Sequence, residues 1–216
     1  MKRLSIFIIG LLISKIIFAQ TINLQGGPSF SKLDWPTPFS DNSVYDQSLI
    51  GYSLFLGLEY LNKTYFNLSS SIGLIRKGGK DEFDLTTPTG EPTGETIIEK
   101  PKLEFVSINT VIDLKYPATE KLFPFISAGP RFDFLISKSE HFDSLDEMKA
   151  VNSSAFGFLF GGGFKYELSK VQIGIRADYY LELNKLAEWP AEPGNLGGEV
   201  RTKTFTINLM IGYIIK

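Results

Sequence analysis

The chain has 216 residues, with 22 Lys and Arg against 24 Asp and Glu, one His and no Cys. The net charge of −2 leaves no basic surface for a nucleic-acid partner, and the lack of Cys excludes disulfides, thiol metal sites and a lipoprotein anchor. The 20 Gly residues and the 13% aromatic share are typical of a chain made of strands and turns.

The first segment in chain order, residues 1–20, has the features of an export signal. Two basic residues precede an apolar run over residues 4–18, and the segment ends in Phe-Ala-Gln, which places a small residue at the cleavage point. A single membrane anchor is the alternative. It is disfavoured because the run is shorter than the about 20 apolar residues of a spanning helix and contains Lys15. We predict a signal peptide at 1–20 and one domain at 21–216.

Eight later segments alternate apolar and polar residues with the period of two that is typical of strands. They cover residues 21–33, 50–60, 65–76, 106–116, 126–137, 156–168, 171–184 and 204–215. The first is the least regular because it contains Gly26, Gly27 and Pro28. Proline lacks the N–H that a strand donates, so we expect irregular pairing there.

The connections between these segments alternate between long and short. The long ones are residues 34–49, 77–101, 139–153 and 185–200, and the short ones are 61–64, 117–122 and 169–170. Consecutive antiparallel strands place alternate connections at opposite ends, so all the long ones share one end. Short periplasmic turns and long extracellular loops are the arrangement of outer-membrane barrels. The sequence therefore predicts an all-β fold, an eight-stranded antiparallel up-and-down transmembrane β-barrel.

The longest connection contains a tandem repeat, Pro-Thr-Gly-Glu at residues 88–91 and again at 92–95. Its composition predicts a flexible polar surface loop. A recognition epitope is the alternative.

A soluble lipocalin-like barrel would show the same alternation, so the character of the two faces has to separate the two folds. One face carries Phe, Ile, Leu and Tyr at nearly every position, which suits contact with lipid and would crowd a small barrel interior. Tyr residues on this face lie near several strand ends, as in an aromatic girdle. The pattern favours the membrane barrel, with outer-membrane lipid as its surroundings.

The opposite face mixes Gly with charges of both signs, which would fill and plug a narrow lumen. The expected lumen charge network consists of Glu59, Asp113, Lys115, Arg131, Asp133, Lys165, Glu167, Arg176, Asp178 and Glu182. Several opposite charges lie two residues apart on this face, and they could form a network with the charges of neighbouring strands. The alternative role for these charges is to set the selectivity of a small gated pore.

Catalytic and metal chemistry have little support. The single His141 lies in Ser139-Glu140-His141-Phe142-Asp143-Ser144, a compact Ser/His/Asp set without an oxyanion-hole motif. One His and no Cys do not make a zinc site. We predict no enzyme activity, no cofactor and no metal.

Three stretches resemble the PorT-like, or porin-family, outer-membrane β-barrel proteins of Bacteroidetes. They are Gly73-Leu74-Ile75-Arg76-Lys77-Gly78, the strand from Leu103-Glu104-Phe105-Val106 to Leu114-Lys115-Tyr116, and Pro124-Phe125-Ile126-Ser127-Ala128-Gly129-Pro130-Arg131. The resemblance spans essentially the whole mature chain and implies location and fold rather than a substrate.

The combined expectation is a structural or interaction barrel with a plugged lumen, related to secretion or the cell envelope. Its expected partners are outer-membrane lipid, the barrel assembly machinery and a protein bound through the extracellular loops. A small-solute porin is the first alternative, and an outer-membrane hydrolase or a soluble lipocalin-like barrel is a more distant one.

Overall fold

The computed structural model describes residues 20–37, 40–143, 151–189 and 197–215. Residues 1–19 of the predicted signal peptide lie outside the described residues. Within the described ranges the structure has twelve strands and one short 3-10 helix. The elements are β1 (Thr21–Thr37), β2 (Ser40–Val44), β3 (Leu49–Asn62), β4 (Phe66–Gly78), β5 (Asp81–Thr86), β6 (Pro92–Glu99), β7 (Lys102–Lys115), β8 (Leu122–Lys138), η1 (Glu140–Phe142), β9 (Ser154–Leu168), β10 (Val171–Glu182), β11 (Ala187–Trp189) and β12 (Gly198–Ile214).

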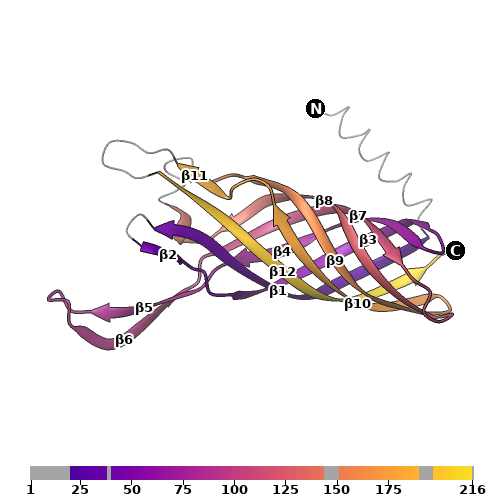
Figure 1. The fold of residues 1–216 in the computed structure, drawn as a ribbon, viewed down its shortest axis with the longest axis horizontal. Coiled ribbons are helices and arrows are strands. Elements are labelled where there is room, and N and C mark those ends of the chain that lie inside the picture. The colour runs from indigo at the N-terminus through magenta and orange to yellow at the C-terminus, as the bar shows by residue number, and fades with distance from the viewer. Residues whose placement is uncertain (1–19, 38–39, 144–150, 190–196, 216) are drawn as a thin grey trace.

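Eight of these strands form a closed antiparallel barrel, as the alternation predicted (Figure 1). Each strand pairs with the next one in the order β1, β3, β4, β7, β8, β9, β10 and β12, and β12 pairs back with β1. The closing register runs from Thr21 opposite Ile214 to Asp34 opposite Arg201. Closure leaves the barrel wall without an unpaired strand edge.

Pairing is irregular at Gly27 and Pro28, as expected from the proline. Both pair with β3, but neither is paired with β12. The register between β1 and β12 is nevertheless the same on either side of the interruption. A Cβ at Gly27 would lie 1.9 Å from the carbonyl oxygen of Ile207, so the two backbones approach each other more closely than any side chain allows.

The two ends of the barrel differ as the connection lengths predicted. One end, called the turn end, carries the short connections and the C-terminal end of β12 (Figure 1). Its tightest turn, between β9 and β10, has Ser169 in the left-handed region with φ 52°. The opposite end, called the loop end, carries β2, β5, β6 and β11 (Figure 1).

Strands occur within the long connections, including the one that was predicted to be a flexible polar surface loop. β1 continues to Thr37 and pairs with β2, and β11 extends the barrel wall by pairing with β12. The tandem repeat is exposed but is part of a β-hairpin: β5 and β6 form a two-stranded sheet of their own, and Pro92–Glu95 belongs to β6. This hairpin projects away from the barrel (Figure 1). Its Thr and Ile residues favour strand conformation, which the Pro and Gly of the repeat concealed.

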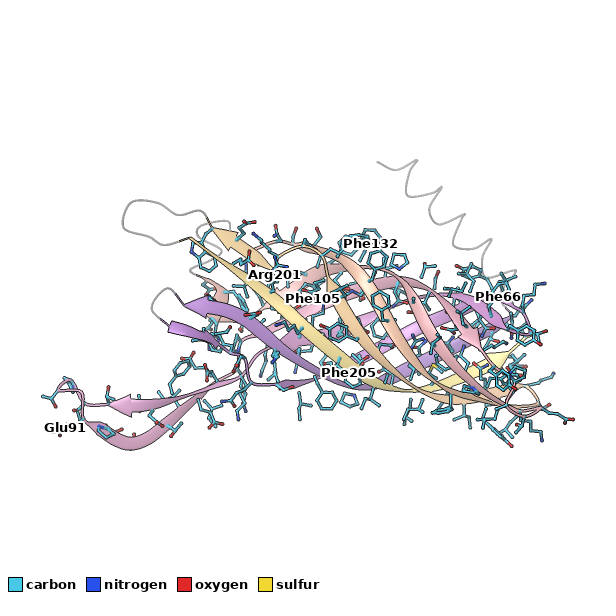
Figure 2. All side chains as sticks on the ribbon, in the orientation of Figure 1. Phe66, Glu91, Phe105, Phe132, Arg201 and Phe205 are labelled. Atoms are coloured by element: carbon cyan, nitrogen blue, oxygen red, sulfur yellow. The ribbon has the colours of Figure 1, made fainter. Side chains whose placement is uncertain are left out.

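The barrel is polar inside and apolar outside. On β12 the outward residues Phe205, Leu209, Ile211 and Tyr213 are all exposed, whereas Thr204, Thr206 and Asn208 point inward and are buried. Side chains project from the outside of the barrel along its whole length (Figure 2). This distribution is the one required of a barrel surrounded by lipid. None of the helical segments within the described ranges is long and apolar enough to cross a membrane.

Candidate functional site

The structure places all ten residues of the expected charge network inside the barrel. Eight of them are buried, and Glu167 and Glu182 are half-buried. Eight of the ten form a cluster around Lys165, a pair of Arg176 with Asp178, and a cluster around Lys77 nearer the loop end. Lys115 and Glu167 belong to none of these groups.

The Lys165 cluster joins strands that lie far apart in the sequence. The Lys165 ammonium lies 2.6 Å from Oε1 of Glu59 and 2.9 Å from Oδ2 of Asp113. The second oxygen of each carboxylate also accepts a hydrogen bond, from Ser127 Oγ at 2.7 Å for Asp113 and from Asn67 Nδ2 at 3.2 Å for Glu59. One cation thus holds two buried carboxylates whose other oxygens are satisfied, which is the condition for a stable buried ion pair.

Arg176 and Asp178, which occupy neighbouring inward positions of β10, form a bidentate salt bridge. Nε and Nη2 of Arg176 donate to the two carboxylate oxygens of Asp178 at 2.7 and 2.8 Å. Gly161, opposite Asp178 on β9, makes room for this pair, since a Cβ there would lie 2.1 Å from Asp178 Oδ1.

Two further predicted residues lie nearer the turn end. Lys115 Nζ donates to Asn62 Oδ1 at 2.5 Å and lies 5.2 Å from the ring centroid of Phe123. Glu167 accepts a hydrogen bond from Gln172 at 3.2 Å. Lys165, two residues before Glu167 on the same face of β9, instead contacts Glu59 and Asp113 on other strands.

The Lys77 cluster contains a residue that the sequence-based prediction missed. Lys77 is fully buried and lies 2.6 Å from Asp133 and 2.5 Å from Glu182. Arg131 reaches the same two carboxylates at 3.2 and 3.4 Å and lies 4.5 Å from the ring centroid of Tyr180. Nε and Nη1 of Arg131 and Oδ1 of Asp133 have no hydrogen-bond partner among the described residues. This cluster is therefore less completely satisfied than the Lys165 cluster.

An apolar cluster fills the lumen toward the loop end, where small residues and charges had been expected. We call it the apolar plug, and it consists of Leu33, Phe55, Ile75, Leu103, Phe105, Val111, Phe142, Leu159, Tyr180, Leu186, Ala187 and Val200. Phe142 comes from η1 and is fully buried, and Trp35 stacks on it with ring centroids 5.9 Å apart. The plug covers the Lys77 cluster, since the Lys77 ammonium lies 4.9 Å from the ring centroid of Phe105.

The base of the β5–β6 hairpin is tied to the loop end by Tyr45. Its backbone N–H donates to Asp81 Oδ2 at 3.1 Å, and its hydroxyl donates to Glu99 Oε2 at 2.5 Å. Burial raises the pKa of the Tyr45 hydroxyl above its ordinary value, and the hydrogen bond to Glu99 raises it further. The hydroxyl therefore stays protonated and donates to Glu99 across the neutral range.

The compact Ser/His/Asp set is used for other contacts. Oγ of Ser139 accepts a hydrogen bond from the backbone N–H of Lys102 at 3.0 Å. Nε2 of His141 lies 3.8 Å from Glu99, and its ring packs edge-on against Tyr45. Ser144 lies outside the described residues. No group of three or more His, Asp or Glu side chains in the described part of the chain could hold a metal ion.

A family model described as "Outer membrane protein beta-barrel domain" matches residues 18–188. No curated protein sequence matches the chain.

Several solved structures are similar. OprG from Pseudomonas aeruginosa has a TM-score of 0.50 at 10% identity, over 90% of this chain and 95% of that one. Neisserial surface protein A has a TM-score of 0.46 at 11% identity, over 90% and 97%. Ail of Yersinia pestis, in complex with the heparin analogue sucrose octasulfate, has a TM-score of 0.42 at 14% identity, over 89% and 97%. At 10% identity the likeness to OprG concerns the fold alone.

Proposed function

Because the chain belongs to the outer membrane protein β-barrel domain family and lies in the outer membrane, we propose that it is a closed structural and interaction barrel with its loop end outside the cell. The observation that carries the proposal is the filling of the lumen. The Lys165 cluster, the Lys77 cluster and the apolar plug follow one another along the barrel interior. An eight-stranded barrel has room for little besides its own side chains.

The proposal includes the route to the membrane. Residues 1–20 act as the signal peptide, residues 21–216 form the barrel domain, and the barrel assembly machinery inserts it. The three stretches around Gly73, Leu103 and Pro124 support a PorT-like protein of Bacteroidetes with a secretion or envelope role. We propose no enzyme activity, because the side chains of Ser139 and His141 are engaged with the hairpin base and with β7.

The hairpin is the surface offered to a protein partner in this proposal. Residues 80–100 contain six acidic and two basic residues, a net charge of −4. The large apolar side chains of Phe83, Ile97 and Ile98 are exposed on the hairpin. A two-stranded hairpin is only marginally stable by itself, so a partner strand or surface would stabilise it.

Electrical measurement distinguishes this function from that of a small-solute porin. We expect the purified protein in planar bilayers to show no stable unit conductance. The double variant Arg131→Ala/Tyr180→Ala removes large side chains near the loop end only, and it should also stay closed because the Lys165 cluster still fills the lumen. One observation favours the porin alternative: buried polar atoms of Arg131 and Asp133 have no hydrogen-bond partner among the described residues. The Lys77 cluster is therefore the part of the lumen filling that could rearrange most easily to open a pore. Steady openings of the unmodified barrel would replace our proposal with that alternative.

Surface labelling tests the orientation. We expect an epitope tag inserted before Gly90, at the hairpin tip, to be bound by antibody on intact cells. Apart from the neighbouring residues of the chain, no atom of the described residues lies within 4 Å of a Cβ built at Gly90, so a tag there would meet no other part of the barrel. The same tag between Ser169 and Lys170, in the β9–β10 turn, should be bound only after the outer membrane is permeabilised. The reverse pattern would contradict the proposed orientation.

A further inference from the structure

Two lysines face each other on the outside of the barrel seam. Lys32 of β1 is directly opposite Lys203 of β12, and both side chains point outward and are exposed. Like charges directly opposite one another on antiparallel strands are destabilising. The next outward pair toward the loop end, Asp34 and Arg201, has opposite charges. Lys32 and Lys203 therefore form a repulsive pair within the seam that closes the barrel.

A hollow of about 490 Å³ lies beside these lysines. Its lining includes Phe30, Lys32, Asp46, Tyr179, Lys203 and Phe205. Phe205 is opposite both Phe30 on β1 and Tyr179 on β10, so the three rings form a row across three neighbouring strands. The ring centroids of Phe30 and Phe205 are 6.5 Å apart. The hollow thus combines an aromatic wall with two ammonium groups.

The hollow lies at the boundary between the apolar band and the charged loop end. From Phe205 to Tyr213 every outward residue of β12 is apolar, whereas Lys203 and Arg201 on the loop-end side are charged. Arg201 lies nearer the loop end than Phe205 (Figure 2). Aromatic side chains collect at the depth of lipid headgroups. A ligand in this hollow would therefore have one part in lipid and one part in water.

The lysines are available to such a ligand. Lys203 lies 3.0 Å from Asp34, but this pair is exposed to solvent on both sides, and exposed pairs contribute little stability. Lys32 forms no ion pair with any residue that the structure describes. Asp46 also lines the hollow and offsets part of the positive charge. With two lysines and one aspartate around it, the hollow has a small net positive charge, which suits a single phosphate better than a polyanion.

We propose that this hollow binds a phosphorylated lipid of the outer leaflet. The phosphate lies between the ammonium groups of Lys32 and Lys203, and an acyl chain follows Phe30, Phe205 and Tyr179 toward the apolar band. The phosphate would remove the repulsion between the two lysines, and the rings would pack against the chain. The inference depends on the outer-membrane location and is independent of whether the lumen conducts.

Native mass spectrometry of the folded protein in detergent tests the proposal. The probes are lipid A carrying two phosphates, the same lipid with both phosphates removed, and inorganic phosphate. The double variant Lys32→Gln/Lys203→Gln should bind phosphorylated lipid A about 30-fold more weakly, because each basic residue at a lipid surface contributes about 1 kcal/mol. The matched control is Lys100→Gln/Lys102→Gln, which removes the same charge at the loop end beside β7, on the other side of the barrel.

The expected pattern has three parts. The unmodified protein and the control variant bind phosphorylated lipid A equally. Removal of the phosphates from the lipid weakens its binding to the unmodified protein as much as the loss of Lys32 and Lys203 does. Inorganic phosphate does not compete. Equal weakening by the control variant would show diffuse charge attraction and overturn the proposal. Competition by inorganic phosphate, or unchanged binding after loss of Lys32 and Lys203, would overturn it as well. Heat-modifiable gel mobility checks that every variant is folded.

Discussion

Replacement of Lys165 by Met is expected to lower the free energy of unfolding by about 3–5 kcal/mol. Lys165 is the cation that contacts both Glu59 and Asp113, and all three side chains are buried. Its removal leaves two buried carboxylates without the cation that contacts both of them, and that loss exceeds the gain from an added apolar side chain. Urea titration of the protein folded into phosphatidylcholine vesicles measures the change.

Two further variants separate this cause from simple loss of a lysine. Lys121→Met, in the exposed β7–β8 turn, should change the unfolding free energy by about 0.5 kcal/mol or less. The triple variant Glu59→Gln/Asp113→Asn/Lys165→Met removes all three charges and should recover most of the loss. A change below about 1 kcal/mol for Lys165→Met would show that water reaches these carboxylates, against the filled lumen.

The substitution Gly27→Ala is expected to prevent normal closure of the barrel. The added Cβ would lie 1.9 Å from the carbonyl oxygen of Ile207, so β1 and β12 would have to separate at the seam. Overpacking of this kind costs about 1–3 kcal/mol or more. The heat-modifiable gel shift that marks a closed barrel should be reduced or lost in refolded protein.

The neighbouring glycine provides a matched control for that experiment. A Cβ at Gly26 would have its nearest contact, Leu54 Cδ1, at 3.4 Å, so Gly26→Ala should fold like the unmodified chain. Equal folded fractions for Gly26→Ala and Gly27→Ala would mean that the close approach at the seam is not required for closure.

The strand count and the two faces could be predicted because alternation is a local property. On β12, for example, each residue from Thr204 to Tyr213 points to the side that the period of two assigns to it. The alternation of long and short connections also predicted that all the long connections lie at one end, since consecutive strands of an up-and-down barrel are antiparallel.

The partners within the lumen could not be predicted from local spacing. Arg131 with Asp133 and Arg176 with Asp178 do pair at a separation of two, but Lys165 contacts Glu59, which is 106 positions away. Such contacts depend on the stagger of the strands around the barrel. Lys77 was missed because the sequence assigned it to the long connection that begins after Arg76, whereas β4 continues through Gly78.

The apolar plug was missed for a related reason. Phe55 and Phe105 occupy inward positions of their strands, but the inward face was characterised by its Gly and charged residues. Phe142 and Leu186 come from connections whose positions no periodicity specifies. Only the folded chain brings these side chains over the Lys77 cluster.

The separate sheet of β5 and β6 has a consequence for the history of the protein. Because neither strand is paired with the barrel wall, the residues between Asp81 and Glu99 can change in length and composition without altering the register of β4 against β7. Long surface connections tolerate insertion at little thermodynamic cost. Lineages carrying this barrel can therefore exchange or lengthen the hairpin as their surroundings change, while the seam between β1 and β12 permits far less variation.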